Sequence, residues 1–371
     1  MNAAGSTEPT PSDSAVRERM RVGVVGPLPP PAGGMANQTL QLSRLLAGEA
    51  VATEIVQVNA PYRPSWIAGV PMIRAVFRFA PYLRTLWRAA GRNDLFHVMA
   101  NSGWSWHLFA APAIWIARLR GIPVVVNYRG GEAETFLRRS SAAVGFSMRR
   151  ASVVVVPSGF LRQVFSKFGL ETRIVPNIVD LDKFHPAPNP PTGTHIVIAR
   201  NLEPLYDIGT GLRAMALLLD RHPEARMSIA GSGPERERLE HLTRELGISA
   251  QVRFTGRLDS AEMAELYRSA TLSLNTALVD NMPNSVLEAL ACGVPVVSTN
   301  VGGVPFLVEH ETTALLVEAG DAAAMAEAMT RLIEDRALRH NLIRNGLAHV
   351  QHFTWERVGR LWMQTYEGAL A

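Results

Sequence analysis

Cysteine and lysine are scarce in this sequence. Cys292 is the single cysteine in 371 residues, which excludes an internal disulfide and favours a reducing compartment. It follows a short apolar segment with no histidine nearby, so we interpret it as a packed small residue and not as a nucleophile. Lys167 and Lys183 are the only lysines, so arginine supplies almost all of the positive charge.

A strong net charge and long hydrophobic runs are also missing. The formal charge is +4 although the isoelectric point is about 9.6, and the basic residues are dispersed, which argues against a nucleic-acid partner. The longest apolar run, residues 108–117, is too short to span a bilayer. Residues 1–19 are polar and lack the apolar stretch of a signal peptide, so we expect a disordered tail on a cytosolic protein, at most peripheral on the inner face of a membrane.

Short β-branched segments alternate with helical patterns along the chain. The expected strands cover residues 22–25, 54–58, 95–99, 123–127, 152–156 and 173–175, then 195–199, 226–230, 252–254, 272–275, 295–298 and 314–317. Helical patterns between them include residues 37–46, 208–220, 235–246, 261–269 and 322–334. Such alternation is typical of parallel sheets covered on both faces. The sequence therefore predicts an α/β protein with two Rossmann-like, doubly wound parallel-sheet domains that face a cleft.

Proline and glycine separate the two halves. Residues 185–193 read HPAPNPPTG, the composition of a linker. We therefore predict a first domain at 20–184 and a second at 194–353. The amphipathic C-terminal helix, 354–371, is expected to pack back across the first domain, and an ordinary terminal helix is the alternative. Ligands of open α/β sheets bind beyond the carboxyl ends of the strands, so residues that follow strands are the candidates for a site.

The most informative segment is residues 280–303, DNMPNSVLEALACGVPVVSTNVGG. Asp280 is followed eight positions later by Glu288, which lies on a short apolar helix that leads into a buried strand. A helix N-terminus attracts phosphate, and carboxylates beside it accept hydrogen bonds from sugar hydroxyls. This pattern predicts a sugar-nucleotide site. The alternative is a plain helix with a capping Asp280 and a solvated Glu288.

Two further features follow predicted strands. Arg200 comes directly after strand 195–199, and its guanidinium fork suits a diphosphate; an ion pair with Glu203 is the alternative. Gly33 and Gly34 follow the first strand, where glycine allows the backbone to approach a ligand; a plain Pro-Gly loop is the alternative. No G-x-G-x-x-G spacing is present, which disfavours a nicotinamide cofactor.

In their order and spacing, these segments resemble the retaining glycosyltransferases of family four, which have the two-domain GT-B fold. Besides 280–303, the resemblance rests on NYRGGEAETF at 127–136, VPSGFLRQVFSKFG at 156–169, IVPNIVDLDKFHP at 174–186, IARNLEP at 198–204, AGSGPERERL at 230–239, FTGRLDSAEMAELYRSA at 254–270 and TALLVEAGD at 313–321. It covers about residues 20–370. It implies transfer of a sugar from a nucleoside-diphosphate sugar to a glycan or lipid-linked acceptor, with retained configuration and without a metal or other cofactor.

By this resemblance the second half binds the donor. Asp280 faces the transferred sugar, in a position where the family has a longer glutamate, and Glu288 accepts hydrogen bonds from the ribose hydroxyls. The remaining predicted donor residues are Gly33, Gly34, Arg200, Gly231, Gly233, Gly256, Arg257, Asn281, Met282, Pro283 and Asn284. Backbone N–H groups of the turn 281–284 are expected to meet phosphate and sugar. Pro283 lacks this donor, which is tolerated in a first helical turn.

The sequence departs from the family pattern at two charged positions. The family usually places a lysine a few residues after Arg200, where this chain has Tyr206 and its neighbours. Either Arg213 or Tyr206 assists Arg200, or the leaving group is less well neutralised. Arg129 stands near the place of a histidine in many relatives. Because arginine is not a base at ordinary pH, we expect Arg129 to bind phosphate or an acidic acceptor.

The predicted acceptor site in the first half consists of His97, Tyr128 and Arg129. For His97, which precedes a Ser-Gly turn, a hydrogen-bonded and partly buried histidine is the alternative.

Residues 61–93 contain six arginines and no acidic residue, interleaved with aromatic and aliphatic side chains. Such a basic amphipathic segment is typical of membrane-surface contact and suits a lipid-linked acceptor. A core helix with a solvated arginine face is the alternative. Pro71 and Pro81 are expected to break any single long helix in this segment.

Two other classes of function stay open. One is a non-catalytic or weakly active GT-B protein that binds a sugar nucleotide, which the missing lysine and Arg129 favour. The other is a different GT-B enzyme, such as a sugar-nucleotide epimerase. A phosphorylase would need a pyridoxal-binding lysine late in the chain, and none follows Lys183. Asp180 and Asp182 form the metal-binding triplet of a different transferase fold, but their place beside the linker argues against a metal site.

Overall fold

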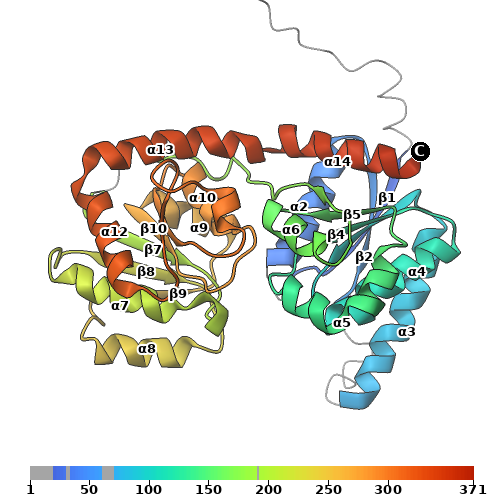
Figure 1. Cartoon of the computed structure of the whole chain (residues 1–371), viewed down its shortest axis with the longest axis horizontal. Coiled ribbons are helices and arrows are strands. Elements are labelled where there is room, and N and C mark those ends of the chain that lie inside the picture. Colours follow the sequence, from blue (N-terminus) through green and yellow to red (C-terminus); the bar gives the residue numbers. More distant parts are fainter. Residues whose placement is uncertain (1–19, 31–33, 61–70, 190–191) are drawn as a thin grey trace, which may run out of the picture. The chain divides into compact units, whose positions relative to one another are not determined.

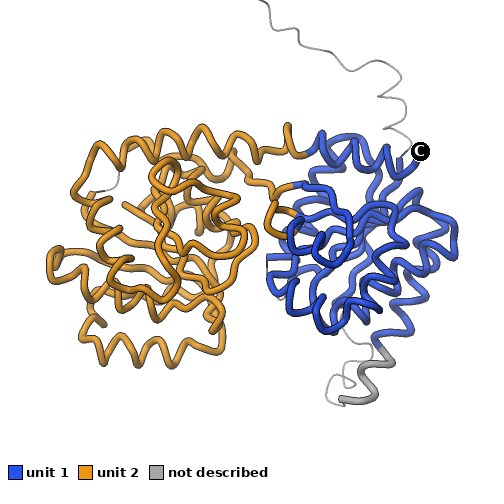
Figure 2. Tube along the Cα trace, viewed as in Figure 1, with its two compact units in different colours: residues 1–156, 162–175, 359–371 blue, residues 157–161, 176–358 orange. Residues whose placement is uncertain are grey.

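Two separate parallel sheets organise the chain. The computed structural model describes residues 20–30, 34–60, 71–189 and 192–371, apart from the side chains of 71–77. Figure 2 shows its two compact units: the first extends to Val156 and includes Arg162–Val175 and Gly359–Ala371, and the second consists of Pro157–Leu161 and Pro176–Val358. The chain passes between the units after Val156, Leu161, Val175 and Val358, and not within residues 185–193, which were predicted as the linker. The last thirteen residues group with the first unit.

The first unit holds a six-stranded parallel sheet in the order β2-β1-β3-β4-β5-β6. Its strands are β1 (Arg21–Gly26), β2 (Ala52–Gln57), β3 (Leu95–Ala100), β4 (Val124–Tyr128), β5 (Val153–Val156) and β6 (Arg173–Ile174). Its helices are α2 (Gly34–Gly48), α3 (Pro71–Ala90), the π-helical turn η2 (Trp106–Ala110), α4 (Ala111–Leu119) and α5 (Ala133–Met148). Helices α6 (Gly159–Ser166) and α14 (Trp355–Leu370) contribute residues to both units. Figure 1 shows the strands between these helices.

The second unit also has a six-stranded parallel sheet, in the order β12-β11-β10-β7-β8-β9. Its strands are β7 (His195–Ala199), β8 (Arg226–Ala230), β9 (Val252–Gly256), β10 (Leu272–Asn275), β11 (Val296–Thr299) and β12 (Leu315–Val317). Its helices are η3 (Pro204–Tyr206), α7 (Ile208–Leu219), α8 (Arg236–Glu245), α9 (Ser260–Arg268), α10 (Asn284–Ala291), α11 (Val304–Leu307), α12 (Ala322–Glu334), α13 (Arg336–Val350) and η4 (Gln351–Phe353). All twelve predicted strands are confirmed, with ends that differ by no more than two residues.

Apolar side chains cover both faces of the second sheet. Ile196 and Ile198 belong to one buried cluster, with helices α7 and α12, whereas Val197 belongs to another, with α10. The alternation follows from the period of two residues along a strand. Cys292 lies in the second cluster, and burial raises the pKa of its thiol to about 12. The prediction that Cys292 is a packed small residue is therefore confirmed.

The expectation that Pro71 and Pro81 break any long helix in residues 61–93 is wrong for helix α3. Pro71 is its first residue, where a missing N–H is harmless, and Pro81 lies inside one continuous helix. Beyond Pro81 the helix buries Tyr82 and Leu86 against the unit, and the Tyr82 hydroxyl donates to Phe109 O at 2.7 Å. This packing stabilises the helix despite the backbone hydrogen bond that Pro81 cannot make. The other part of the predicted membrane-binding segment, 61–70, lies outside the described residues.

Within the described ranges, no helix combines the length and the apolarity that are needed to cross a bilayer.

In the second unit, the order of strands reverses between β7 and β10. Strands β8 and β9 lie on one side of β7, and β10 pairs with its other side, with Leu274 opposite Ile198. Loops that leave two such strands diverge, and ligands of open α/β sheets bind between them. The residues just after β7 and β10 therefore form the first place to look for a site.

Candidate functional site

The carboxyl ends of β7 and β10 bring Arg200, Asn275 and Asp280 together. Arg200 follows β7, and its Nε and Nη2 donate to Asn275 Oδ1 at 3.0 and 2.9 Å. The same Nη2 also contacts Asp280 Oδ2 in an ion pair whose side chains are only 12% and 10% exposed. Asn275 completes its hydrogen bonds by donating from Nδ2 to Ser298 Oγ at 2.9 Å. A cation and an anion are thus held in one buried network at the switch point.

The contacts of Arg200 do not include Glu203, the ionic partner that was the alternative to a diphosphate. The ionic partner of Arg200 is Asp280, whereas Glu203 accepts from Asn201 Nδ2 at 3.3 Å. Asp280 has both oxygens engaged, because its Oδ1 accepts from the backbone N–H of Asn281 at 2.9 Å. Burial lowers the pKa of Arg200, and the charge of Glu288 partly compensates for this. The two predicted carboxylates therefore lie in the same electrostatic environment as the predicted phosphate-binding arginine.

Glu288 occupies a desolvated place on α10. Burial raises the pKa of its carboxyl to about 7, while the charge of Arg200 and the hydroxyl of Tyr267 act in the opposite direction. Tyr267 is completely buried and donates to Ser285 O at 3.1 Å. These surroundings differ from those of a solvated surface glutamate, for which no desolvation would be expected.

The N-terminus of α10 lies in the same part of the sheet edge. Pro283 is its N-cap, and the first helical residue is Asn284, so the expectation that Pro283 lies in the first helical turn is corrected by one position. At the N-cap, the missing N–H of Pro283 does not remove a donor from the first turn of α10, because that turn begins at the next residue. The first-turn N–H groups point out of the helix and are suited to an anion.

Two residues that the sequence analysis did not assign hold this turn. Asn177 donates from Nδ2 to Met282 O at 2.8 Å and to Asn284 Oδ1 at 2.6 Å. Ser158 donates from Oγ to Asn281 Oδ1 at 2.6 Å. Ser158 follows β5 and Asn177 follows β6, and each comes directly after a proline. Their position beyond the carboxyl end of a strand is the signal by which they could have been found.

Gly231 and Gly233, two of the predicted donor-binding glycines, allow the backbone of the loop that begins at Arg200 to approach closely. A Cβ atom at Gly231 would lie 1.9 Å from Arg200 O, and one at Gly233 would lie 2.2 Å from Leu202 O. The Gly231 N–H donates to Gly256 O at 2.8 Å, and both residues have positive φ. Only glycine allows these approaches. Direct contact of these glycines with a donor stays a prediction.

Tyr206 occupies the place of the expected lysine. The centre of its ring lies 4.9 Å from Arg200 Cζ, a cation–π contact that contributes no positive charge. Arg213 is exposed on α7, and Arg257 is exposed and donates from Nε to Ser232 Oγ at 2.6 Å. Of the two groups named as possible assistants of Arg200, Tyr206 is therefore the one in contact with it. In the part of the chain that is described, no group of three or more His, Cys, Asp or Glu side chains is arranged to hold a metal.

Gly302 and Gly303, which close the informative segment, support the backbone of Asp280. The Gly303 N–H donates to Asp280 O at 2.9 Å, and a Cβ atom at Gly303 would lie 1.7 Å from Asn281 O. We expect Gly303→Ala to lower the free energy of unfolding by at least about 2 kcal/mol, because backbone must move. Urea unfolding measures this. Gly48→Ala is the control, since nothing lies within 4 Å of its Cβ position, and an equal loss in both variants would contradict the close-approach argument.

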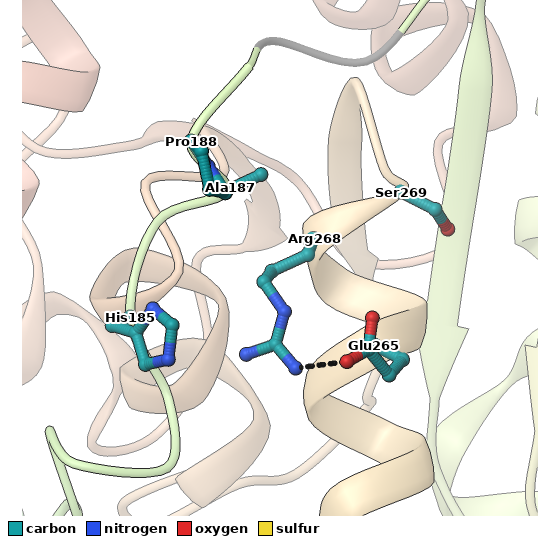
Figure 3. A pocket seen from close by; sticks show the side chains of 6 residues that line it. All are labelled: His185, Ala187, Pro188, Glu265, Arg268 and Ser269. Carbon is teal, nitrogen blue, oxygen red and sulfur yellow. Dashed lines mark hydrogen bonds and ion pairs between the residues drawn. The ribbon is translucent and has the colours of Figure 1, made fainter.

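A shallow pocket of about 480 Å³ lies elsewhere in this unit, and Figure 3 shows its lining. His185, Ala187 and Pro188 form one wall, and residues at the end of α9 form the other. Arg268 crosses it, with ion pairing to Glu265 at 2.6 Å. His195, the first residue of β7, bonds to Ser269 O, so this pocket lies at the amino ends of the strands. It is separate from the network around Arg200.

Comparison with known proteins agrees with this geometry. The sequence model described as Glycosyl transferases group 1 matches residues 182–349, and the model described as Glycosyltransferase Family 4 matches residues 32–183. Between them the two models cover most of the chain. The chain belongs to the family 4, group 1 glycosyltransferases.

The relatives of this chain include curated proteins named D-inositol 3-phosphate glycosyltransferase. A D-inositol 3-phosphate glycosyltransferase of Corynebacterium jeikeium is 32% identical over 214 residues, which are 53% of this chain and 51% of the relative. A protein of the same name from Acidothermus cellulolyticus is 31% identical over 57% of this chain and 51% of its own length. The chain thus spans about half the length of the curated relatives it matches.

Two solved structures that superpose on this chain show its fold. Sucrose-phosphate synthase from Thermosynechococcus elongatus superposes with a TM-score of 0.76 at 22% identity, over 94% of this chain and 100% of that one. Anabaena Alr3699/HepE in complex with UDP gives a TM-score of 0.74 at 18% identity, over 94% and 99%. With its two Rossmann-like sheets, the chain has the GT-B fold.

The predicted acceptor residues lie in the first unit. Arg129 follows β4 and is partly buried, and its Nε donates to Asn127 Oδ1 at 2.7 Å. Because arginine only donates, this bond fixes the orientation of the Asn127 amide, whose Nδ2 then donates to His97 Nε2 at 2.9 Å. His97 must therefore carry its proton on Nδ1, 2.7 Å from the Tyr366 hydroxyl of α14.

This network supports the alternative for His97, a hydrogen-bonded histidine inside the unit. The ring lies in the middle of β3, is completely buried and has both nitrogens bonded. Burial and the nearby charge of Arg129 lower the pKa of His97 to about 3, so it is neutral at physiological pH. Tyr128 is also buried and bonds to Ser102 Oγ at 2.6 Å. Of the three predicted acceptor residues, only Arg129 retains partial exposure; Gly33 lies outside the described residues.

We expect Tyr366→Phe to destabilise the first unit by about 1–3 kcal/mol, because the His97 Nδ1–H loses its buried acceptor. Urea unfolding checks the loss, with the exposed Arg360→Gln on the same helix as control. Nitrogen-15 NMR tests the tautomer independently: the wild-type ring should stay neutral down to about pH 4 with Nδ1 protonated, given its pKa of about 3. A cationic ring at pH 6, or the other tautomer, would refute the network.

Proposed function

We propose that this chain is a retaining glycosyltransferase that moves a sugar from a nucleoside-diphosphate sugar to a glycan or lipid-linked acceptor. We further propose that it needs no metal and works in the cytoplasm, at the inner face of a membrane. The observation that supports the proposal best is the joining of Arg200, Asp280 and Glu288 beside the N-terminus of α10. These groups match the chemistry of a diphosphate flanked by two sugars.

Arg200 has a free side for the diphosphate. Its Nε and Nη2 are bonded to Asn275 and Asp280, whereas Nη1 takes no part in these contacts. We assign the diphosphate to Nη1 and to the first-turn N–H groups of α10, which attract anions. Glu288 then accepts hydrogen bonds from the ribose hydroxyls as a carboxylate.

The reaction proposed is substitution on the face that the diphosphate leaves. The acceptor oxygen forms a bond to the anomeric carbon as the bond from that carbon to the phosphate oxygen breaks. The proton of the acceptor hydroxyl passes to the leaving diphosphate. Negative charge grows on the diphosphate, and each well-placed donor such as Arg200 typically contributes about 3–4 kcal/mol to its stabilisation. Among the residues discussed, none is assigned as a covalent nucleophile.

Arg129 is the candidate contact for the acceptor. Burial lowers its pKa to about 10, so it remains a cation at neutral pH, and it is suited to an acidic group. The matched relatives are named for D-inositol 3-phosphate, and this supports a phosphate-bearing acceptor. The acceptor class stays a proposal.

A protein that binds the donor without turnover is the second candidate. It is favoured by Tyr206, which stands where the family has a lysine, and by the ion pair that already occupies one side of Arg200. A nucleotide sugar whose leaving group is weakly neutralised would bind and react slowly.

A thermal-shift screen with UDP-, GDP- and ADP-sugars separates these candidates. A true donor at about one hundred times its Kd should stabilise the protein by about 2.7 kcal/mol. UDP-glucose is the first choice, since a related fold is described in complex with it. Stabilisation with transfer or hydrolysis supports the transferase, stabilisation without turnover supports the binding protein, and no shift with any nucleotide sugar overturns both.

A further inference from the structure

Three neighbouring helices of the first unit each expose a large apolar side chain near their C-terminal end. Trp87 of α3 is 47% exposed, Leu119 of α4 is 73% exposed and Phe146 of α5 is 52% exposed. Helix α3 packs against α4 and α4 against α5 (Figure 1). Each helix ends shortly before β3, β4 or β5, so the three ends share the amino edge of one parallel sheet. Grouped exposure of this kind marks an interaction site, unlike scattered apolar residues.

Arginine side chains lie over the aromatic rings of this edge. Arg120, just after α4, has its Cζ 4.9 Å from the centre of the Trp87 ring on α3. Arg150, just after α5, lies 3.5 Å from the Phe146 ring centre and 4.9 Å from that of Trp115 on α4. These contacts cross from helix to helix, so the three helix ends form one continuous surface.

The charge of this surface is of one sign. Its arginines are Arg84, Arg88, Arg118, Arg120, Arg149 and Arg150, and among the described residues none of them is ion-paired with a carboxylate. Asp94, the nearest acid to Arg88 along the chain, pairs with Arg21, and Glu134, the nearest to Arg149, pairs with Arg138. The helix dipole explains a basic residue at a helix C-terminus. It does not explain six unpaired arginines beside half-exposed apolar side chains.

We propose that this basic-aromatic surface binds the surface of an anionic lipid bilayer. The guanidinium groups meet the headgroup phosphates, and Trp87, Leu119 and Phe146 enter the boundary between headgroups and acyl chains. Apolar and cationic groups alternate here at the same exposed edge, which matches the layering of a bilayer interface. Arg84, Trp87 and Arg88 belong to the predicted membrane-binding segment 61–93, and the rest of the surface lies outside it. The proposal rests on the membrane location proposed above and does not depend on the donor site.

Sedimentation of the full chain with vesicles tests the proposal. The wild type should bind vesicles of phosphatidylcholine and phosphatidylglycerol in about a two-to-one ratio at least tenfold more tightly than vesicles of phosphatidylcholine alone. Arg88→Gln, Arg120→Gln and Arg149→Gln together should weaken this binding about a hundredfold, at roughly fivefold for each arginine. Added salt should weaken wild-type binding in the same direction.

A second variant separates apolar insertion from charge. Trp87→Ser, Leu119→Ser and Phe146→Ser together should weaken binding to the anionic vesicles at least tenfold at unchanged net charge. The control carries Arg244→Gln, Arg253→Gln and Arg336→Gln, which remove the same charge from exposed sites in the second unit, and should bind as the wild type does.

Circular dichroism and thermal unfolding confirm that each variant is folded. Equal binding by the wild type and both surface variants would overturn the proposal. So would binding to heparin without binding to anionic vesicles, a result that would favour an acidic macromolecule as the partner.

Discussion

Glu288→Gln is expected to stabilise the unliganded protein at about pH 8 and to lower its use of a sugar nucleotide at least about a hundredfold. Burial raises the pKa of Glu288 from 4.5 to about 7, so the folded state holds this proton more tightly than the unfolded state. The stabilisation is complete below about pH 4.5 and is lost as the pH rises through about 7. The loss amounts to about 3 kcal/mol, and glutamine avoids it because it carries no charge.

Urea unfolding at about pH 5 and pH 8 measures this difference. The wild type should lose stability between the two values relative to Glu288→Gln, and the exposed Glu318→Gln should follow the wild type. Donor use should move in the opposite direction: kcat/KM should fall at least about a hundredfold, because hydrogen bonds to a charged acceptor contribute roughly 1.5–3 kcal/mol each. Normal turnover in Glu288→Gln would remove the ribose assignment.

Arg200→Gln is expected to have the largest effect on stability. It leaves the Asp280 carboxylate buried without its cation, and the loss of one member of a buried pair typically costs about 3–5 kcal/mol. The second change, Asp280→Asn, should restore most of that loss, because it removes the uncompensated charge. Donor binding should not recover in the double variant, since the proposed diphosphate contact at Arg200 Nη1 is still missing. Transfer should fall by about a hundredfold to a thousandfold in both.

Unfolding free energies of the wild type, the two single variants and the double variant test this cycle, with nucleotide-sugar affinity measured in parallel. The surface pair of Arg221 and Glu334, 2.9 Å apart and about half exposed, supplies the control: Arg221→Gln should change stability by no more than about 1 kcal/mol. Recovery of both stability and donor affinity in the double variant would show that Arg200 serves the fold and not the donor.

Much of the fold followed from local pattern. Many strands are short apolar runs rich in β-branched residues, because a strand that is buried on both faces of a parallel sheet must be apolar along most of its length. This constraint acts on consecutive residues, so it can be recognised in a short segment such as Val153–Val156. The place of Arg200 at a strand end followed in the same way, because parallel strands all end at one edge. Helix α3 was misjudged because the buried side of Tyr82 and Leu86 outweighs the local effect of Pro81.

The partners within the site could not be predicted in this way. Asn275 is bonded to Arg200 and Ser298, which are 75 and 23 residues away in the chain. Asn177 reaches a turn that lies more than a hundred residues further on. Hydrogen bonds between such distant residues depend on the register of strands and on loop paths, which local pattern does not contain. The proton position on His97 likewise depends on a tyrosine 269 residues away.

The amino-acid sequence by itself determined the two α/β units, the placement of Arg200, Asp280 and Glu288 near strand ends, and the resemblance to family 4 glycosyltransferases. These features depend on residue type and short-range order. Only the tertiary structure decided that Arg200 pairs with Asp280, that His97 is enclosed, and that three helix ends form one basic surface. Such contacts join residues far apart in the chain, and their energy depends on burial, which exists only after the chain has folded.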